Sequence, residues 1–267
     1  MAARARFWLS LVFVVVAVVI AVMVSGVSWS DLQHLQTPRN AIDVNGESVK
    51  VPLPSPAEVR VLPVVEVTTT GAYAFMFEDA GSAVRYDPCR VIPLVINPAG
   101  GPGDGNAMIL EAVMRVEAAT GLKFAFEGDT TEPAAFGRSL IQPERYGERL
   151  VPVIIGWSSA DATPELLGSV TGLGGSSSVT GAYGDDRYLT SGVVILDAPD
   201  LLDLAETPNG RALALTVIMH EIAHVVGLDH VNDPTELMNA TNTSLADWGP
   251  GDRAGLALAG AGSCQDV

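Results

Sequence analysis

The distribution of apolar and polar positions predicts strands and helices that alternate along the middle of the chain. Residues 91–96 form a continuous apolar run, which is typical of a buried strand. Residues 122–127, 150–157 and 192–197 indicate three further strands, and a helix is expected from about residue 107 to residue 119. Strands that alternate with helices favour an α/β architecture built around one mixed sheet.

A second helix is expected directly after residues 207–209 and is apolar on nearly all sides. Its apolar residues are Leu213, Ala214, Leu215, Val217, Ile218, Met219, Ile222, Ala223, Val225 and Val226. A helix with this pattern is buried in the core. It also carries His220 and His224, and a buried histidine pair needs polar partners. One metal ion would serve both imidazoles, and the alternative is that each hydrogen-bonds to the backbone.

Residues 59–77 are rich in β-branched and aromatic side chains. Tyr73, Phe75 and Phe77 alternate with other residues, so we expect one or two strands in this segment. Residues 78–81, Glu-Asp-Ala-Gly, are expected to form the turn that follows.

A glycine-rich stretch, residues 97–106, separates the first strand from the first helix. A glycine loop in this position can cradle a phosphate, but these glycines do not match G-x-G-x-x-G and no Gly-Lys-Ser/Thr follows. We therefore interpret the stretch as a flexible connection, with Asp104 or Asn106 as the helix cap.

The N-terminal segment has features of a membrane span or of a signal peptide. Arg4 and Arg6 precede residues 7–24, which are uncharged and almost entirely apolar. A span of this length just crosses the core of a bilayer, whereas the apolar part of a signal peptide is usually shorter. Residues 24–26 match a cleavage pattern poorly. A retained signal anchor is therefore favoured over a cleaved signal peptide, and both place the downstream chain outside the cytoplasmic membrane.

Composition limits the classes of partner. The chain has 267 residues, of which 31 are acidic and 15 are basic, for a net charge of −16. Nucleic-acid binding needs basic surface, so that class of function is excluded. An apolar content of 48% is sufficient for one sizeable core.

One stretch has the spacing of a metal site, His-Glu-x-x-His-x-x-Gly-x-x-His. His220 and His224 are four residues apart, so they lie on one face of a helix. Gly227 can adopt the left-handed conformation that ends a helix, after which His230 can approach the same ion. Three neutral imidazoles leave one position open on tetrahedral zinc, as in catalytic sites. Glu221 lies beside the first ligand and can reach a water on the metal.

This motif resembles the zinc site of the metzincin proteases, and among them the chain is most similar to the matrixins. Metzincins carry a methionine turn beneath the metal, and Met238 within residues 236–239 is the matching residue. Residues 247–256 resemble the start of the last matrixin helix, and the resemblance extends from residue 86 to residue 258.

The resemblance implies a zincin fold of the α/β (α+β) type, with two long helices above a twisted mixed sheet. A small, irregular C-terminal subdomain after Gly227 would hold the methionine turn and the final helix. Residues 168–184 would contain the edge strand of the sheet, which can pair with an extended peptide, although a mobile surface loop is the alternative. The expected organisation is an anchor or signal peptide (1–29), a proline-containing stalk (30–58) and a catalytic domain (59–267).

The implied activity is zinc-dependent hydrolysis of peptide bonds in proteins or peptides outside the cytoplasm. Zinc lowers the pKa of its water, and Glu221 acts as general base and then passes the proton to the leaving amine. Two alternatives from other classes are a catalytically silent surface-binding module on the same fold and a stalked structural protein without metal. Chelator-sensitive peptide turnover and metal analysis distinguish them from a protease.

The two cysteines allow either a disulfide or a latency switch. Cys89 and Cys264 fall near the two ends of the expected catalytic domain, so a bridge would tie its start to its tail. The latency switch of matrixin propeptides reads Pro-Arg-Cys-Gly, whereas residues 87–90 read Asp-Pro-Cys-Arg. The disulfide is therefore favoured.

The chain departs from the matrixin pattern in two respects. It has four histidines, three of them in the motif, so the second, histidine-bound zinc that matrixins usually carry is excluded. Oxygen ligands near Asp185 and Asp186 could bind calcium, but a solvated turn is the favoured interpretation there. Val231 replaces the serine that commonly follows the third histidine, which leaves the subfamily open.

Overall fold

The computed structural model describes residues 41–44, 47–51, 57–182, 186–241 and 244–265, all within the compact unit formed by residues 40–267. The elements in chain order are β1 (Ala41–Val44), β2 (Glu47–Lys50), β3 (Ala74–Phe75), β4 (Glu78–Asp79), β5 (Ser82–Ala83), β6 (Val91–Asn97), α3 (Gly105–Thr120), β7 (Lys123–Asp129), α4 (Pro143–Tyr146), β8 (Val153–Ser158), the 3₁₀ helix η1 (Pro164–Leu166), β9 (Gly172–Thr180), β10 (Arg187–Asp197), α5 (Ala198–Ala205), α6 (Gly210–Val225), β11 (Leu228–Asp229) and α7 (Pro250–Gly260).

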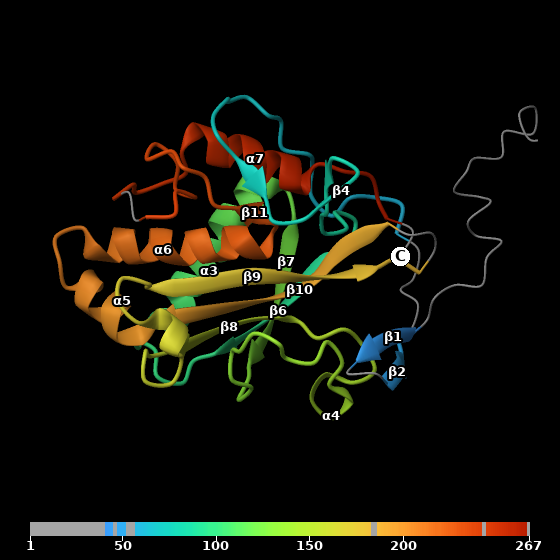
Figure 1. Cartoon of the computed structure of the whole chain (residues 1–267), viewed down its shortest axis with the longest axis horizontal. Coiled ribbons are helices and arrows are strands. Elements are labelled where there is room, and N and C mark those ends of the chain that lie inside the picture. Colours follow the sequence, from blue (N-terminus) through green and yellow to red (C-terminus); the bar gives the residue numbers. More distant parts are fainter. Residues whose placement is uncertain (1–40, 45–46, 52–56, 183–185, 242–243, 266–267) are drawn as a thin grey trace, which may run out of the picture. The chain divides into compact units, whose positions relative to one another are not determined.

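A five-stranded mixed sheet forms the centre of the fold, in the order β7-β6-β8-β10-β9 (Figure 1). The first four strands are parallel, and β9 pairs antiparallel with β10 as the last strand in the order. The expected mixed α/β architecture is therefore confirmed.

The two faces of the sheet are covered differently. The main core lies between one face and helices α3 and α6, where Leu94, Ile96, Ile109 and Ile218 are fully or almost fully buried. A smaller cluster on the other face contains alternate strand residues such as Val95 and Ile154 and is covered by loop residues together with Leu166 of η1 and Tyr146 of α4. Adjacent residues of a strand point to opposite faces, so a strand buried on both faces reads as the continuous apolar run seen in β6.

The predicted strands and helices of the middle region are present with shifted ends. Helix α3 runs from Gly105 to Thr120, and β8 begins at Val153, three residues after its predicted start. Strand β10 begins at Arg187, well before the predicted residue 192, because its first half pairs with β9 from Arg187 opposite Thr180. Pairing between strands thus extends β10 into a segment of mixed composition, residues 187–191.

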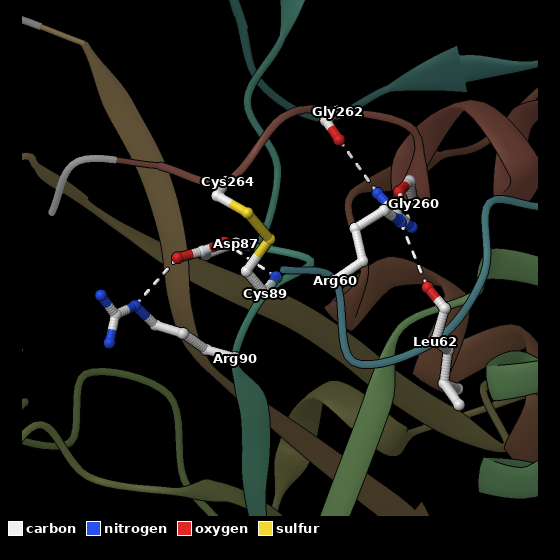
Figure 2. The surroundings of a disulfide bond; sticks show 8 residues. All are labelled: Arg60, Leu62, Asp87, Cys89, Arg90, Gly260, Gly262 and Cys264. Carbon is white, nitrogen blue, oxygen red and sulfur yellow. Dashed lines mark hydrogen bonds and ion pairs between the residues drawn. A yellow bond between two sulfur atoms is a disulfide. The ribbon is translucent and has the colours of Figure 1, made fainter. Parts of the chain in front are cut away.

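The prediction of one or two strands within residues 59–77 is confirmed by one strand of two residues, β3. Only β3 is a strand there, and it pairs with β11, which follows the metal motif. The preceding segment runs along α7 without strand pairing. Two of its own side chains attach it to the two ends of that helix. Arg60 donates to the carbonyls of Gly260 and Gly262 (Figure 2), and the Thr69 hydroxyl donates to the Pro250 carbonyl. The turn predicted at residues 78–81 is confirmed as the tip of the β4–β5 hairpin, where Ala80 and Gly81 both have positive φ.

The glycine-rich connection before α3 packs over a tryptophan. A Cβ at Gly101 would lie 2.5 Å from Nε1 of Trp157, and one at Gly105 would lie 2.9 Å from its Cζ2. Glycine is therefore required by contact with an indole ring rather than by a phosphate. Asp104 occupies the predicted cap position of α3, but its side chain makes no capping hydrogen bond.

A disulfide joins Cys89 to Cys264, with their Cα atoms 5.3 Å apart (Figure 2). Beside it, the Asp87 carboxylate accepts a hydrogen bond from the Cys89 amide and forms an ion pair with Arg90. The bond fixes the tail that follows α7 to the segment that precedes β6, as expected from the positions of the two cysteines.

In the part of the chain that the structure describes, no helix combines the length and the apolar character needed to cross a bilayer. The predicted span at residues 7–24 lies outside the described residues, and so does most of the predicted stalk.

Candidate metal centre

Helix α6 supplies two of the three motif histidines. It is buried along nearly its whole length, as its apolar composition predicts, and it begins after Asn209. His220 and His224 occupy adjacent turns on the same face, and their Nε2 atoms lie 3.2 Å apart. The four-residue spacing of the motif therefore brings the two imidazoles together.

The chain reverses directly after α6 and brings the third histidine to the other two. Gly227 has a φ of 103°, a conformation that L side chains rarely adopt. Two residues of β11 follow, and His230 then places its Nε2 3.0 Å from that of His220 and 3.2 Å from that of His224. The structure thus brings together all three histidines, as the sequence predicts.

Backbone carbonyls fix the tautomers of the two helical histidines. Nδ1 of His220 lies 2.7 Å from the Leu237 carbonyl oxygen, and Nδ1 of His224 lies 2.8 Å from that of Leu228. A carbonyl oxygen only accepts, so each Nδ1 carries the proton and each Nε2 presents a lone pair. Two lone pairs that face each other cannot hydrogen-bond, whereas a cation between them satisfies both.

The spacing of the three Nε2 atoms also fits a small cation. In tetrahedral zinc sites with Zn–N distances of about 2.0–2.1 Å, neighbouring nitrogens lie roughly 3.3 Å apart. The three measured separations, 3.0, 3.2 and 3.2 Å, are close to that value. The donor set and its geometry therefore match zinc with three nitrogen ligands.

Burial keeps the helical histidines neutral. It lowers the pKa of His220 to about 3, with a further contribution from neighbouring His224, and it lowers the pKa of His224 to about 4. Both imidazoles are then uncharged at neutral pH, which is the form that binds a metal.

Glu221 lies beside the histidines in the same cleft and is almost completely buried. Burial raises the pKa of its carboxyl to about 8. The cleft has a volume of about 360 Å³ and is lined by Ser169, Val170, Thr171, Gly172, Leu173, Gly174, Thr216, Val217, His220, Glu221, His224, His230, Leu237, Asn239 and Ala240. It thus lies between the first residues of β9, the helix α6 and the turn at residues 237–240.

Two buried carboxylates hold the turn that carries Met238. Asp252, in the first turn of α7, accepts hydrogen bonds from the amides of Leu237, Met238 and Gly249. Glu236 accepts in return from the amides of Gly251 and Asp252. The turn and the start of α7 therefore brace each other, and the Leu237 carbonyl in this turn is the one that holds His220.

Met238 is 1% exposed and belongs to the main core, and its carbonyl accepts from the Val231 amide. Glu236 and Asp252 were not singled out from the sequence. The sequence did carry a signal for Asp252, which stands three positions after Gly249, the residue that precedes α7. An acidic residue at this position commonly caps the start of a helix.

The calcium prediction stays a prediction. Asp185 lies outside the described residues, and Asp186 is exposed. Among the His, Cys, Asp and Glu side chains of the described ranges, those of the three motif histidines bring their ligand atoms together.

Residues 174–248 match the family model of the matrixins (Peptidase M10). This segment contains all three histidines, Glu221 and Met238, so the similarity to matrixins covers the residues that carry the motif. A matrixin-like segment with this histidine triad supports a metallopeptidase. The mixed α/β fold is compatible with that family.

No curated protein matches the chain. Among solved structures, the "GM1 bound form of the ECX AB5 holotoxin" is similar at 12% sequence identity, over 65% of this chain and 81% of that chain, with a TM-score of 0.34.

Proposed function

We propose that the protein is a zinc-dependent endopeptidase of the metzincin, matrixin-like type. The observation that carries the proposal is the convergence of three Nε2 atoms within 3.2 Å of one another, beside a buried glutamate and inside a matrixin-like segment. On this proposal His220, His224 and His230 are the metal ligands, and Met238 is the methionine of the turn beneath the metal.

The proposed chemistry needs one general base and no protein nucleophile. A zinc ion held by the three imidazoles supplies Lewis-acid activation of water and of the peptide carbonyl. Glu221 accepts the proton that the attacking water loses and returns it to the departing amine nitrogen, so the peptide bond is broken and one water is consumed. The carbonyls of Leu228 and Leu237 keep Nε2 of the two helical histidines free of a proton.

The proposed substrate is an extended segment of protein or peptide. Strand β9 is the last strand in the sheet, and its first residues, Gly172–Gly174, line the cleft beside Glu221. An extended peptide laid along this edge would pair with it through backbone groups, which tolerates many side chains.

The proposed location is outside the cytoplasmic membrane, with residues 7–24 as the anchor. The Cys89–Cys264 disulfide supports this location, because disulfides persist in oxidising compartments.

The test is hydrolysis of a peptide library by the purified protein, with and without a zinc chelator. We expect turnover that the chelator abolishes and added zinc restores. Glu221→Gln should retain stoichiometric zinc and lose at least about 100-fold in kcat, because the general base is removed and the ligands are not. Glu206→Gln, an exposed position after α5, serves as the matched control and should retain activity.

The outcomes separate the competing functions. Stoichiometric zinc without turnover in the wild-type protein would indicate a binding module on this fold. Failure to bind zinc would refute the metal site itself. Full activity in Glu221→Gln would refute Glu221 as the base.

A further inference from the structure

Two glycines of β9 face the helix that carries the proposed base. A Cβ at Gly172 would lie 2.7 Å from Cγ of Glu221 and 3.0 Å from both its Cδ and its Oε1. A Cβ at Gly174 would lie 2.8 Å from Cα of the same glutamate. Residues two apart in a strand point to the same face, so Gly172 and Gly174 present one bare patch of backbone to Glu221.

Gly175 points to the opposite face and provides a comparison within the same strand. A Cβ there would meet only the ring of Phe136, at 3.0 Å, and that side chain is 53% exposed. The lining of the cleft along β9 ends at Gly174. Contact with Glu221 thus leaves no room for a Cβ at residues 172 and 174. At residue 175 a Cβ would contact only the side chain of Phe136.

The requirement at Gly172 concerns space and not backbone conformation. Gly172 is absent from the glycines with positive φ, so an L side chain fits its backbone angles without strain. Glycine within a strand weakens the strand, and it commonly marks a place where another group approaches closely. The close group here is the side chain of Glu221 and not its backbone.

We propose that Gly172 is a positioning residue for the general base. Its missing side chain leaves the space in which the Glu221 carboxylate lies, between the edge strand and helix α6. The catalytic consequence rests on the proposed function, because it assumes that Glu221 takes the proton from water. The contact itself does not depend on that assumption.

The first test compares the kinetics of Gly172→Ala and Gly175→Ala in the full-length protein. A methyl group at residue 172 displaces Cγ and Cδ of Glu221, and a displacement of about 1 Å at a catalytic group costs roughly 100-fold in rate. We expect kcat of Gly172→Ala to fall about 100-fold while KM and zinc affinity stay within about threefold of wild type. Gly175→Ala, whose Cβ points away from Glu221, should keep kcat and zinc affinity within about threefold of wild type. A kcat of Gly172→Ala within threefold of wild type, or a loss that lies in KM, would overturn the proposal.

The second test is a stability cycle that needs no activity. Overpacking against Glu221 should lower the Tm of Gly172→Ala by roughly 5 °C. In a Glu221→Ala background Cγ and Cδ are gone, so the same substitution should leave Tm nearly unchanged. Gly174→Ala should lower Tm in both backgrounds, because its Cβ meets backbone atoms that Glu221→Ala retains.

The two tests fail separately. An equal fall in Tm for Gly172→Ala in both backgrounds overturns the proposed contact, whatever the enzyme does. If wild-type protein binds zinc and hydrolyses no peptide, the proposed function fails and the catalytic role of Gly172 with it, while the stability cycle still decides the contact.

Discussion

Burial moves the pKa values of neighbouring residues in opposite directions at this site. It lowers the pKa of His220 to about 3 and of His224 to about 4, and it raises the pKa of Glu221 to about 8. The cause is shared, because burial disfavours whichever form carries the charge. All three residues are therefore uncharged near neutral pH before a cation binds, and a bound cation would favour the ionised form of Glu221.

The first prediction concerns the stability of the metal-free protein as a function of pH. Below about pH 6.5 the unfolded chain binds protons that folded His220 and His224 do not, so stability falls as pH decreases. Between about pH 4.5 and 8 folded Glu221 holds a proton that the unfolded chain releases, so its contribution falls as pH rises. We expect the free energy of unfolding to be greatest near pH 6.5 and to decline towards pH 8, by at most about 1.4 kcal/mol per pH unit from this one group.

Denaturant unfolding of the chelator-treated protein at several pH values measures this curve. Glu221→Gln cannot titrate, so the decline between pH 6.5 and 8 should be absent from that variant. An identical decline in both proteins would assign it to other groups.

Residue types account for how much of the site was predictable. The three histidines and Glu221 fall within eleven consecutive positions, and ion-binding chemistry restricts the residue types, so the sequence identifies them. Leu228 and Leu237 contribute only backbone carbonyls, which any residue has, and no pattern marks them. Gly172 was covered only by the expected edge strand within residues 168–184, because its role depends on contact with a helix about fifty residues further along the chain.

At the scale of elements, local patterns predicted what a segment is and not what it pairs with. Strand β6 and helices α3 and α6 were predicted because their burial leaves a periodic or continuous apolar pattern. The extended segment before β3 has the composition of a strand, but its partner is α7, to which it is attached through Arg60 and Thr69. Strand pairing is a tertiary property, and β-branched composition alone does not supply a neighbour.

The next prediction tests the bracing of the Met238 turn by α7. Asp252→Asn replaces one carboxylate oxygen with an NH₂ group. This NH₂ group would face a backbone N–H that now donates to Asp252, so a buried hydrogen bond is lost and two donors point at each other. We expect zinc affinity to fall about 10–100-fold, because the Leu237 carbonyl in this turn holds His220. Competition with a chromophoric chelator measures that affinity.

Asp247→Asn is the matched control for this prediction. Asp247 lies in the same segment, but it is half exposed and pairs with the exposed Arg253. Exposed ion pairs contribute little, so zinc affinity should stay within about twofold of wild type. Wild-type zinc affinity in Asp252→Asn would show that the turn does not position His220.

At the scale of the whole molecule, the disulfide is the longest-range covalent constraint in the described chain. It closes a loop of 175 residues. In the chain-entropy account, a loop of this length raises the free energy of unfolding by up to about 5 kcal/mol, and measured values are commonly lower.

The last prediction follows from that constraint. Replacing both Cys89 and Cys264 by Ser should lower the free energy of unfolding by about 2–5 kcal/mol, because the unfolded chain regains the freedom that the bond removes. Zinc affinity of the folded variant should not change, since the ligands and their carbonyl partners belong to other segments. Chemical denaturation measures the stability and chelator competition measures the affinity.

Reduced wild-type protein is the control. It should be as unstable as the double variant if the covalent bond is responsible. Loss of stability in the variant alone would instead be due to serine at the buried Cys89 position.

The Cys89–Cys264 bond has a further consequence if the proposed peptidase cleaves its own chain. A backbone break anywhere between the two sulfur-bearing positions yields fragments that remain covalently joined. A self-nicked molecule would therefore migrate as an intact chain on a gel until a reductant is added. The disulfide would keep both fragments, including the one that carries the histidine cluster, in one molecule.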